Sequence, residues 1–376
     1  MHVVVSKKDL SRILKQCQGV ADKKSTMPVL GNVLLEAHEG EIRVSATDLF
    51  IAVRGAARAE VAQPGQIAVG ARELSDRVDK MPEGQISITG TENSAITIRA
   101  VGSARRYTLN GIPGEDFPTL PSADPNAVPL VLPVSTLSSL IQKTQFSISQ
   151  DETRQHLNSA LFEWEGERVR MVTTDGHRLS KVEATVPGKQ ASATMLIPNK
   201  GIQQLKRLCD EALGDKEQPE LTMTQSGPNA FFVLGAFQFS VKLVEAQFPP
   251  YQRVIPDQTE RAIRVPKAAV QDTLNAMLVA ASDRTSGVKM TVTEDKICFE
   301  SENPESGAAF DEIVVDYRGS EVTVGFNARY FTDVLKVIDQ SEVILGISGE
   351  LDPAVLRPAS EDVDHSHIAV VMPMRI

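Results

Sequence analysis

A short apolar strand followed by an amphipathic helix recurs six times along this chain of 376 residues. In the first copy three valines precede a run in which apolar residues recur at helical spacing, namely Leu10, Ile13, Leu14, Cys17 and Val20. Ser6 stands at the expected N-cap, and Asp9 three residues later suggests a weak capping box. The copies span residues 3–20, 66–89, 130–149, 194–224, 263–282 and 321–348, so the chain consists of three double repeats.

Alternating polar and apolar stretches separate the paired copies, at residues 32–54, 159–183 and 287–300. Such alternation predicts antiparallel hairpins, with turns at Glu39-Gly40, Glu165-Gly166 and Glu294-Asp295. Each repeat would then hold two helices and about eight strands. Two helices cannot cover both faces of that much sheet, so we expect an α+β fold with helices on one side and sheets on the other. Tandem copies with free edges should pair edge to edge.

A Phe-Pro pair close to further prolines follows the first and the second repeat, at residues 116–121 and 247–256. Proline ends strands and stiffens extended linkers. We therefore predict three domains, at residues 1–127, 128–253 and 254–376.

Charge is segregated along the chain, whose formal net charge is −10. Residues 6–24 hold six bases and two acids, whereas residues 294–321 hold nine acids and two bases. An acidic protein is a poor nucleic-acid binder unless its bases are gathered on one surface. No apolar run is long enough to span a membrane, so we expect a cytoplasmic protein.

The familiar motifs of catalysis are missing from the sequence, including nucleotide-binding glycine loops, a serine elbow and HExxH. The segment Asp175-Gly176-His177 leaves open a hydrolase that uses Asp175 and His177. His365 and His367 lie in an acidic stretch without a convincing ligand set, so we expect no metal site and no cofactor. The three cysteines, Cys17, Cys209 and Cys298, lie in apolar patterns and should be buried thiols.

Seven motifs in this order mark a resemblance over the whole chain. They are MPVLGNVLLEA (27–37), ATDL (46–49), FPTLP (117–121), DETRQHLNSALFE (151–163), TTDGHRL (173–179), QFPPYQRVIP (247–256) and VMPMRI (371–376). The chain resembles the family of bacterial DNA polymerase III beta subunits, the replicative sliding clamps. The resemblance implies three tandem clamp domains and a head-to-tail homodimeric ring whose helices line a hole around duplex DNA. It implies a processivity factor that is not an enzyme.

The resemblance also implies which residues face DNA, through backbone contacts that do not depend on sequence. These are Lys24, Arg72, Lys200, Arg207 and Arg284, with Arg12 and Gln150. For the dimer interface it implies that Tyr107 and Leu109 in the first domain meet Val279 and Ala280 in the third.

Family members bind the polymerase III alpha subunit, the clamp loader, other polymerases and repair proteins through short linear peptides. The positions of the matching motifs place this groove at Arg154, Leu157, Thr174, Gly176, His177, Arg178, Leu179, Pro249, Arg253, Val254, Tyr330, Val370, Met372, Pro373, Met374 and Arg375. Among them, Arg178 and Arg375 could meet an acidic or carbonyl group of the peptide. A tandem-repeat scaffold that never touches DNA is the remaining alternative to the clamp and the hydrolase.

Overall fold

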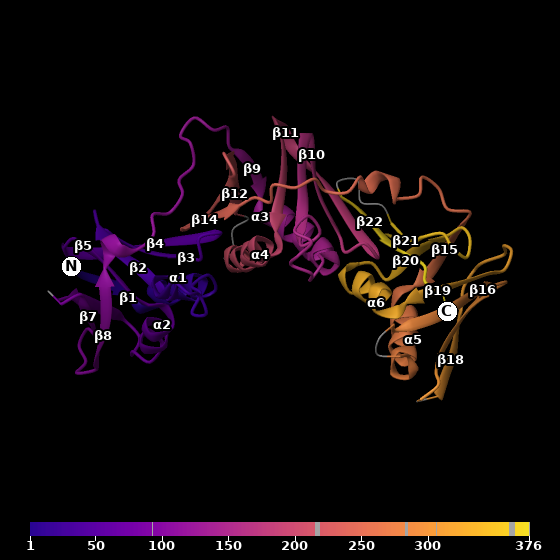
Figure 1. Cartoon of the computed structure of the whole chain (residues 1–376), viewed down its shortest axis with the longest axis horizontal. Helices are drawn as coiled ribbons and strands as arrows, with labels where there is room; N and C mark the ends of the chain where they lie inside the picture. Colours follow the sequence, from indigo (N-terminus) through magenta and orange to yellow (C-terminus); the bar gives the residue numbers. More distant parts are fainter. Residues whose placement is uncertain (92, 215–218, 283–284, 306, 361–364, 376) are drawn as a thin grey trace. The chain divides into compact units, whose positions relative to one another are not determined.

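The computed structural model describes residues 1–91, 93–214, 219–282, 285–305, 307–360 and 365–375. It forms two compact units. Figure 1 shows the helices and strands coloured by their position in the sequence. The first unit comprises Met1–Ser138 and Lys200–Leu243, and the second comprises Ser139–Asn199 and Val244–Ile376. The division between them therefore passes through the central repeat.

The first unit is built on one sheet in the order β1-β6-β7-β8-β5-β2-β3-β4-β14-β13-β12-β9. Its strands are β1 (His2–Ser6), β2 (Asn32–His38), β3 (Glu41–Thr47), β4 (Ile51–Gln63), β5 (Gly65–Gly70), β6 (Gln85–Gly90), β7 (Ala95–Ala100), β8 (Arg106–Pro113), β9 (Leu130–Pro133), β12 (Glu220–Ser226), β13 (Asn229–Leu234) and β14 (Phe237–Lys242). Its helices are α1 (Lys7–Gln18), α2 (Ala71–Asp79), most of α4 (Asn199–Leu213) and the start of α3 (Val134–Thr144), with the short turns η1 (Pro28–Gly31) and η2 (Gly114–Asp116).

The second unit holds two sheets, in the orders β10-β11-β22-β21-β20-β15 and β18-β17-β16-β19. Their strands are β10 (Ser159–Thr174), β11 (Arg178–Pro198), β15 (Arg261–Pro266), β16 (Gly287–Thr293), β17 (Lys296–Asn303), β18 (Gly307–Val314), β19 (Val322–Asn327), β20 (Glu342–Ile347), β21 (Ala354–Pro358) and β22 (His365–Val371). The helices are α5 (Lys267–Ala280) and α6 (Ala328–Val337), with the short turns η3 (Gln145–Ser147) and η4 (Tyr251–Arg253).

All six predicted strand–helix units are confirmed. Helix α1 buries the predicted stripe, including Leu10, Ile13 and Leu14. The predicted capping box is wrong, because the Ser6 side chain makes no hydrogen bond at the N-cap. Ser6 is still paired with Gln85 in the sheet, and the carbonyl of Gly84 accepts the Lys7 N–H instead.

Two of the three predicted hairpin turns are confirmed, at Glu39-Gly40 and at Glu294-Asp295. The turn at Glu165-Gly166 is wrong, because β10 runs through both residues. There the pairing of β10 with β11 shifts register at Gly166, and the Trp164 indole N–H donates to the Gly166 carbonyl at 3.0 Å. Among the described residues, the central repeat therefore has six strands, of which β10 and β11 are long, whereas the first and third repeats have eight each.

The predicted edge-to-edge pairing of the repeats is confirmed at two joints. The last strand of the central repeat, β14, pairs with β4 from Phe237↔Gly55 to Val241↔Ile51. The last strand of the third repeat, β22, pairs with β11 from Arg178↔Val371 to Ala184↔His365. Within the described residues, no helix is long and apolar enough to cross a membrane.

Candidate functional site

The turn between β10 and β11 is fixed by the side chains of Thr174 and Asp175. One Asp175 carboxylate oxygen accepts the backbone N–H groups of His177 and Arg178, at 2.9 and 3.0 Å. The Thr174 hydroxyl donates to the Arg178 carbonyl at 2.7 Å, and Gly176 takes φ +92° between them. The turn is thus an Asx-type turn in which Gly176 supplies the left-handed residue.

The Arg178 guanidinium lies at the centre of a polar cluster. It donates to Asp333 at 2.7 Å, to Asp175 at 3.0 Å and to the Phe146 carbonyl at 2.6 Å. The central carbon of the guanidinium, Cζ, lies 4.5 Å from the centre of the Tyr330 ring. That ring stacks on the His177 ring, with 6.5 Å between the two ring centres. The Arg178 side chain is only 12% exposed, so we find it used inside the chain rather than presented to a partner.

The C-terminal segment passes along this turn. Strand β22 pairs Val370 with Leu179, and beyond it the Met372 N–H donates to the His177 carbonyl at 2.9 Å. The Met374 N–H then donates to the Gly325 carbonyl at 2.8 Å. The end of the chain is therefore held between the β10–β11 turn and strand β19.

Every residue predicted for the peptide groove belongs to the second unit. Leu179 and Val370 lie in a buried cluster with Tyr251, and Leu157 is also buried. His177, Arg253, Val254 and Met372 are exposed, and Thr174 and Gly176 shape the turn beside them. Arg375 and Arg154 are also exposed, and Arg154 forms an ion pair with Asp151 at 3.3 Å. The half-buried members are Pro249, Tyr330, Pro373 and Met374.

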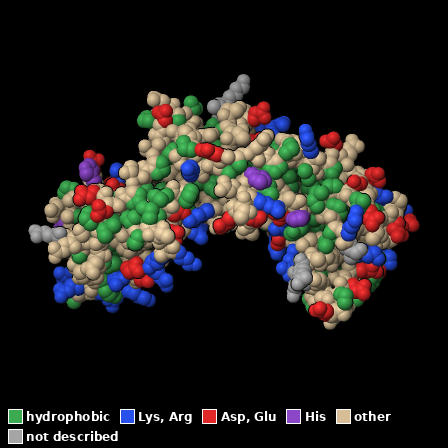
Figure 2. All heavy atoms as spheres, viewed as in Figure 1, with side chains coloured by type: hydrophobic (Ala, Val, Ile, Leu, Met, Phe, Trp, Pro, Cys, Tyr) green, Lys and Arg blue, Asp and Glu red, His purple; other side chains and the backbone are tan. Residues whose placement is uncertain are grey.

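Most of the residues predicted to face DNA lie on helices of the first unit. Figure 2 shows Lys and Arg side chains gathered over the part of that unit that carries α2 and β8, and acidic side chains over β16–β18 of the second. Lys24 is exposed, and Arg72 lies 3.7 Å from Asp76 on the next turn of α2.

The remaining predicted DNA residues share their polar groups with the chain itself. Arg12 lies 3.4 Å from Glu211 and over the Phe237 ring, and Lys200 forms an ion pair with Asp48. Arg207 donates to Gln204 at 3.5 Å, and Gln150 in the second unit donates to the Ile148 carbonyl at 3.3 Å. Arg284 lies outside the described residues.

The predicted dimer residues lie on two separate elements. Tyr107 is half-buried and Leu109 buried on β8, so Leu109 offers little surface of its own. Val279 at the end of α5 is 85% exposed, and Ala280 is half-buried. Strand β18 pairs with β17 alone among the described strands, and its Phe310 and Val314 are exposed.

Comparison with known proteins assigns the chain. Residues 1–121, 131–250 and 252–375 match the models of the N-terminal, central and C-terminal domains of the DNA polymerase III beta subunit. The beta sliding clamps of Pseudomonas putida and Escherichia coli are 32% and 31% identical, each over 100% of both chains. A crystal structure of the Pseudomonas aeruginosa clamp bound to griselimycin matches with TM-score 0.93 and 30% identity, over 100% of both chains.

The chain belongs to the DNA polymerase III beta subunit family. It is a sliding clamp with three tandem clamp domains, and it is a processivity factor rather than an enzyme. The hydrolase alternative is not favoured, since Asp175 is engaged by three donors of its own turn. Among the described residues, no group of three or more His, Cys, Asp or Glu could hold a metal ion.

Two residues that contact Arg178 escaped the sequence analysis. Asp333 and Phe146 contact Arg178 from distant parts of the chain, and only the spacing of Asp333 three residues after Tyr330 could have drawn attention to it. Burial raises the pKa of Tyr330, and the Asp175 charge adds to the rise.

Buried titratable groups lie away from the groove. Burial lowers the pKa of His367 to about 4, with a smaller contribution from Lys143, and its ring bonds to the Ser180 hydroxyl at 3.0 Å. Burial raises the pKa values of Cys17 and Cys209, as expected for inert thiols. The prediction of a buried thiol is wrong for Cys298, which is half-exposed on β17.

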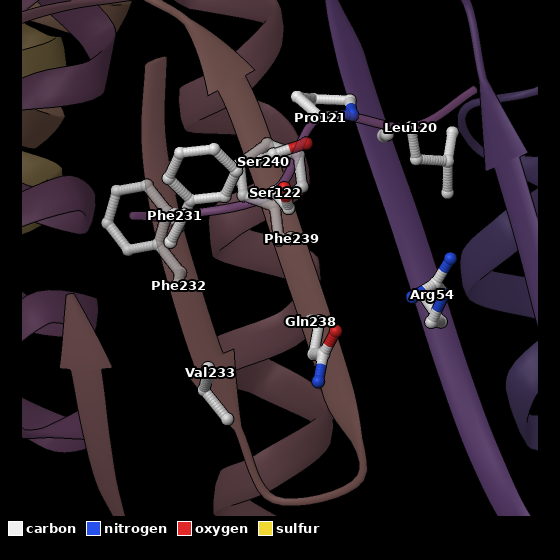
Figure 3. A pocket seen from close by; sticks show the side chains of 12 residues that line it. Arg54, Leu120, Pro121, Ser122, Phe231, Phe232, Val233, Gln238, Phe239 and Ser240 are labelled. Atoms are coloured by element: carbon white, nitrogen blue, oxygen red, sulfur yellow. The ribbon is translucent and has the colours of Figure 1, made fainter. Parts of the chain in front are cut away.

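A shallow pocket of about 220 Å³ in the first unit was also missed. Figure 3 shows Phe231, Val233 and Gln238 on β13 and β14, with Leu120 and Pro121 of the linker and Arg54 of β4 beyond them. The linker that follows the first repeat therefore lies over the joint between β4 and β14.

Proposed function

We propose that two copies of this clamp close head to tail into a ring around duplex DNA. The supporting observation is the repeated strand joint. The last strand of one repeat pairs with the preceding repeat at β4–β14 and again at β11–β22. By repetition, the same joint would form between β8 of the first repeat and β18 of the third repeat in the partner copy.

The residues at these two strands are complementary. Arg106 begins β8 and Arg105 precedes it, whereas Asp311 and Glu312 lie on β18. Both acids already have a partner within the chain, Thr273 for Asp311 and Lys296 for Glu312, so the attraction between the strands is moderate. The exposed Phe310 would be covered by the partner copy, as would Val279. Tyr107, Leu109 and Ala280 complete the proposed interface.

The ring retains DNA by enclosing it, and its contacts go to phosphates. We place Lys24, Arg72, Lys200 and Arg207 toward DNA, together with Arg12, Gln150 and Arg284. Arg12 and Lys200 already face carboxylates, so their net attraction for phosphate is reduced. Arg72 also faces a carboxylate, that of Asp76, so the exposed Lys24 is the stronger candidate.

Partners attach as short linear peptides in the groove formed by the β10–β11 turn, the 249–254 segment and the C-terminal segment. The polymerase III alpha subunit, the clamp loader and other polymerases or repair proteins would share it. The exposed Met372 and Val254 provide adaptable apolar contacts. A peptide with two or three buried apolar side chains gains binding free energy from each of them, and part of that gain is lost to association. The remainder corresponds to a dissociation constant of about 1 μM.

The proposed domains are residues 1–127, 128–253 and 254–376. Because its DNA and its polymerase are in the cytoplasm of a bacterium, the clamp would act there.

Sedimentation of a β18 variant tests the ring. Phe310→Lys places a charge on the free strand and should convert the dimer into monomers. Val233→Lys, an exposed strand position of the first unit, is the matched control and should remain dimeric. A Phe310→Lys protein that sediments like the control would rule out this interface.

A further inference from the structure

Asp333 on α6 is outside the predicted groove, yet it contacts the side chain at the groove's centre. Its Oδ2 accepts from Arg178 at 2.7 Å, and its Oδ1 accepts from Lys336 at 3.1 Å. A charge-assisted bond to a side chain that is 12% exposed is stronger than a surface ion pair.

Asp333 and Tyr330 are three residues apart on α6, so they lie on one face of the helix. The guanidinium that Asp333 holds is the same one that lies 4.5 Å from the Tyr330 ring. Asp333 thereby fixes where the cation sits over this ring, while Asp175 and the Phe146 carbonyl fix its other donors.

The effect reaches the exposed part of the groove through His177. Its ring stacks on Tyr330 with an angle of 21° between the planes, and its carbonyl holds the Met372 N–H. The path from Asp333 to Met372 therefore consists of contacts between named neighbours, each at hydrogen-bond or ring-stacking distance.

We infer that Asp333 is a positioning residue for partner binding, which holds Arg178 over Tyr330 and so keeps His177 and Met372 in the geometry that a partner peptide meets. Arg178 is then a structural cation rather than a ligand for acidic groups of the partner. This inference rests on the proposed peptide groove.

The matched control is Asp339, which accepts from Lys143 at 3.1 Å in the same unit but contacts neither Arg178 nor Tyr330. Asp333→Asn and Asp339→Asn make the same change of charge. With fluorescently labelled polymerase III alpha subunit as the probe, Asp333→Asn should bind about tenfold more weakly, and Asp339→Asn within about twofold of the parent. Asp333→Glu, which keeps the charge, should recover part of the loss.

A second readout separates positioning from a general loss of stability. In methyl NMR of methionine-labelled clamp, the Met372 signal should shift in Asp333→Asn and stay in place in Asp339→Asn. An unmoved Met372 signal with parental affinity in Asp333→Asn would overturn the inference, and so would equal losses of affinity in both variants. If the parent still bound the alpha subunit after removal of residues 373–376, the proposed groove itself would be wrong, whatever Asp333 does.

Discussion

The turn at residues 47–51 of the first unit and the turn at residues 174–178 of the second are built alike. In both, a threonine hydroxyl donates to the carbonyl four residues later, and an aspartate oxygen accepts two backbone N–H groups. Both turns precede a strand that pairs with the next repeat. The repeat thus supplies the same joint twice.

The two turns differ in what surrounds them. In the first, Asp48 binds Lys200 at the start of α4, and position 51 is a buried isoleucine. In the second, the equivalent position is Arg178, which Asp175 and Asp333 hold between them. The hydrogen bond from the Met372 N–H to the His177 carbonyl is common to both, since the Lys242 N–H bonds to the Phe50 carbonyl at 2.8 Å in the first turn.

This comparison shows how the same turn acquires different surroundings without a new fold. The strand joint and the turn provide rigidity in both places. What distinguishes the second turn is Arg178 in place of a buried isoleucine, with its contacts to Asp333 and Tyr330. The proposed function places partner binding there.

Among the changes considered, removal of residues 373–376 should have the largest effect, because it alters partner binding at the second joint and leaves the first joint intact. It deletes one side of the groove, including Met374, which bonds to Gly325. We expect at least about a hundredfold loss of affinity for the alpha subunit, since more than one apolar contact is lost. Fluorescence titration measures this loss, and sedimentation should still show a dimer.

Arg178→Ala and Lys200→Ala compare the two central cations directly. Arg178 is largely buried, and its loss leaves the Phe146 carbonyl without a side-chain donor and Asp333 with Lys336 alone, so unfolding should become easier by about 2–4 kcal/mol. Lys200 is half-exposed, and Asp48 keeps two backbone donors without it, so the cost should be under about 1 kcal/mol. Urea unfolding of both variants decides the order, and equal midpoints would contradict it.

His367 lies in the second joint and should make its stability depend on pH. The paired residues of the first joint include no histidine. The pKa of His367 is about 4 when folded, below the ordinary 6.5, so the unfolded chain gains a proton first as pH falls. The contribution of neutral His367 to the free energy of unfolding is complete above pH 6.5. It is lost as the pH falls from 6.5 to 4, by up to about 3 kcal/mol. His367→Asn should flatten the urea midpoint over this range. A parallel pH profile for parent and variant would refute the assignment.

The smallest effects concern the left-handed residue of each turn. Leu49 holds φ +76° and Gly176 holds φ +92°. Leu49→Asn should stabilise the clamp by about 0.5 kcal/mol, because asparagine tolerates this conformation. Gly176→Ala should cost about 1 kcal/mol, although nothing lies within 4 Å of the added carbon. Thermal unfolding measures both changes in stability. If Gly176→Ala raised the unfolding temperature, the positive φ at residue 176 would not determine the effect of the substitution.

Periodicity alone was enough to predict the helices and the pairing of repeats, because each copy carries a helical stripe such as Leu10, Ile13 and Leu14. It failed at Glu165-Gly166, where a glycine that commonly marks a turn instead accommodates a shift of register inside a long strand. The resemblance named the groove residues and suggested that Arg178 meets the peptide, but it did not show that its donors are used within the chain. That Arg178 is buried against Asp333 depends on a contact between residues 155 positions apart, which no local pattern encodes.

Retention on DNA tests the central claim, that the clamp encloses DNA as a ring. The clamp is loaded on nicked circular DNA, and its retention is followed as salt is raised and after the circle is cut. Enclosure predicts that the clamp stays on the circle at salt that removes ordinary phosphate-binding proteins, and that it leaves once the DNA is linear. Equal loss from circular and linear DNA would contradict it.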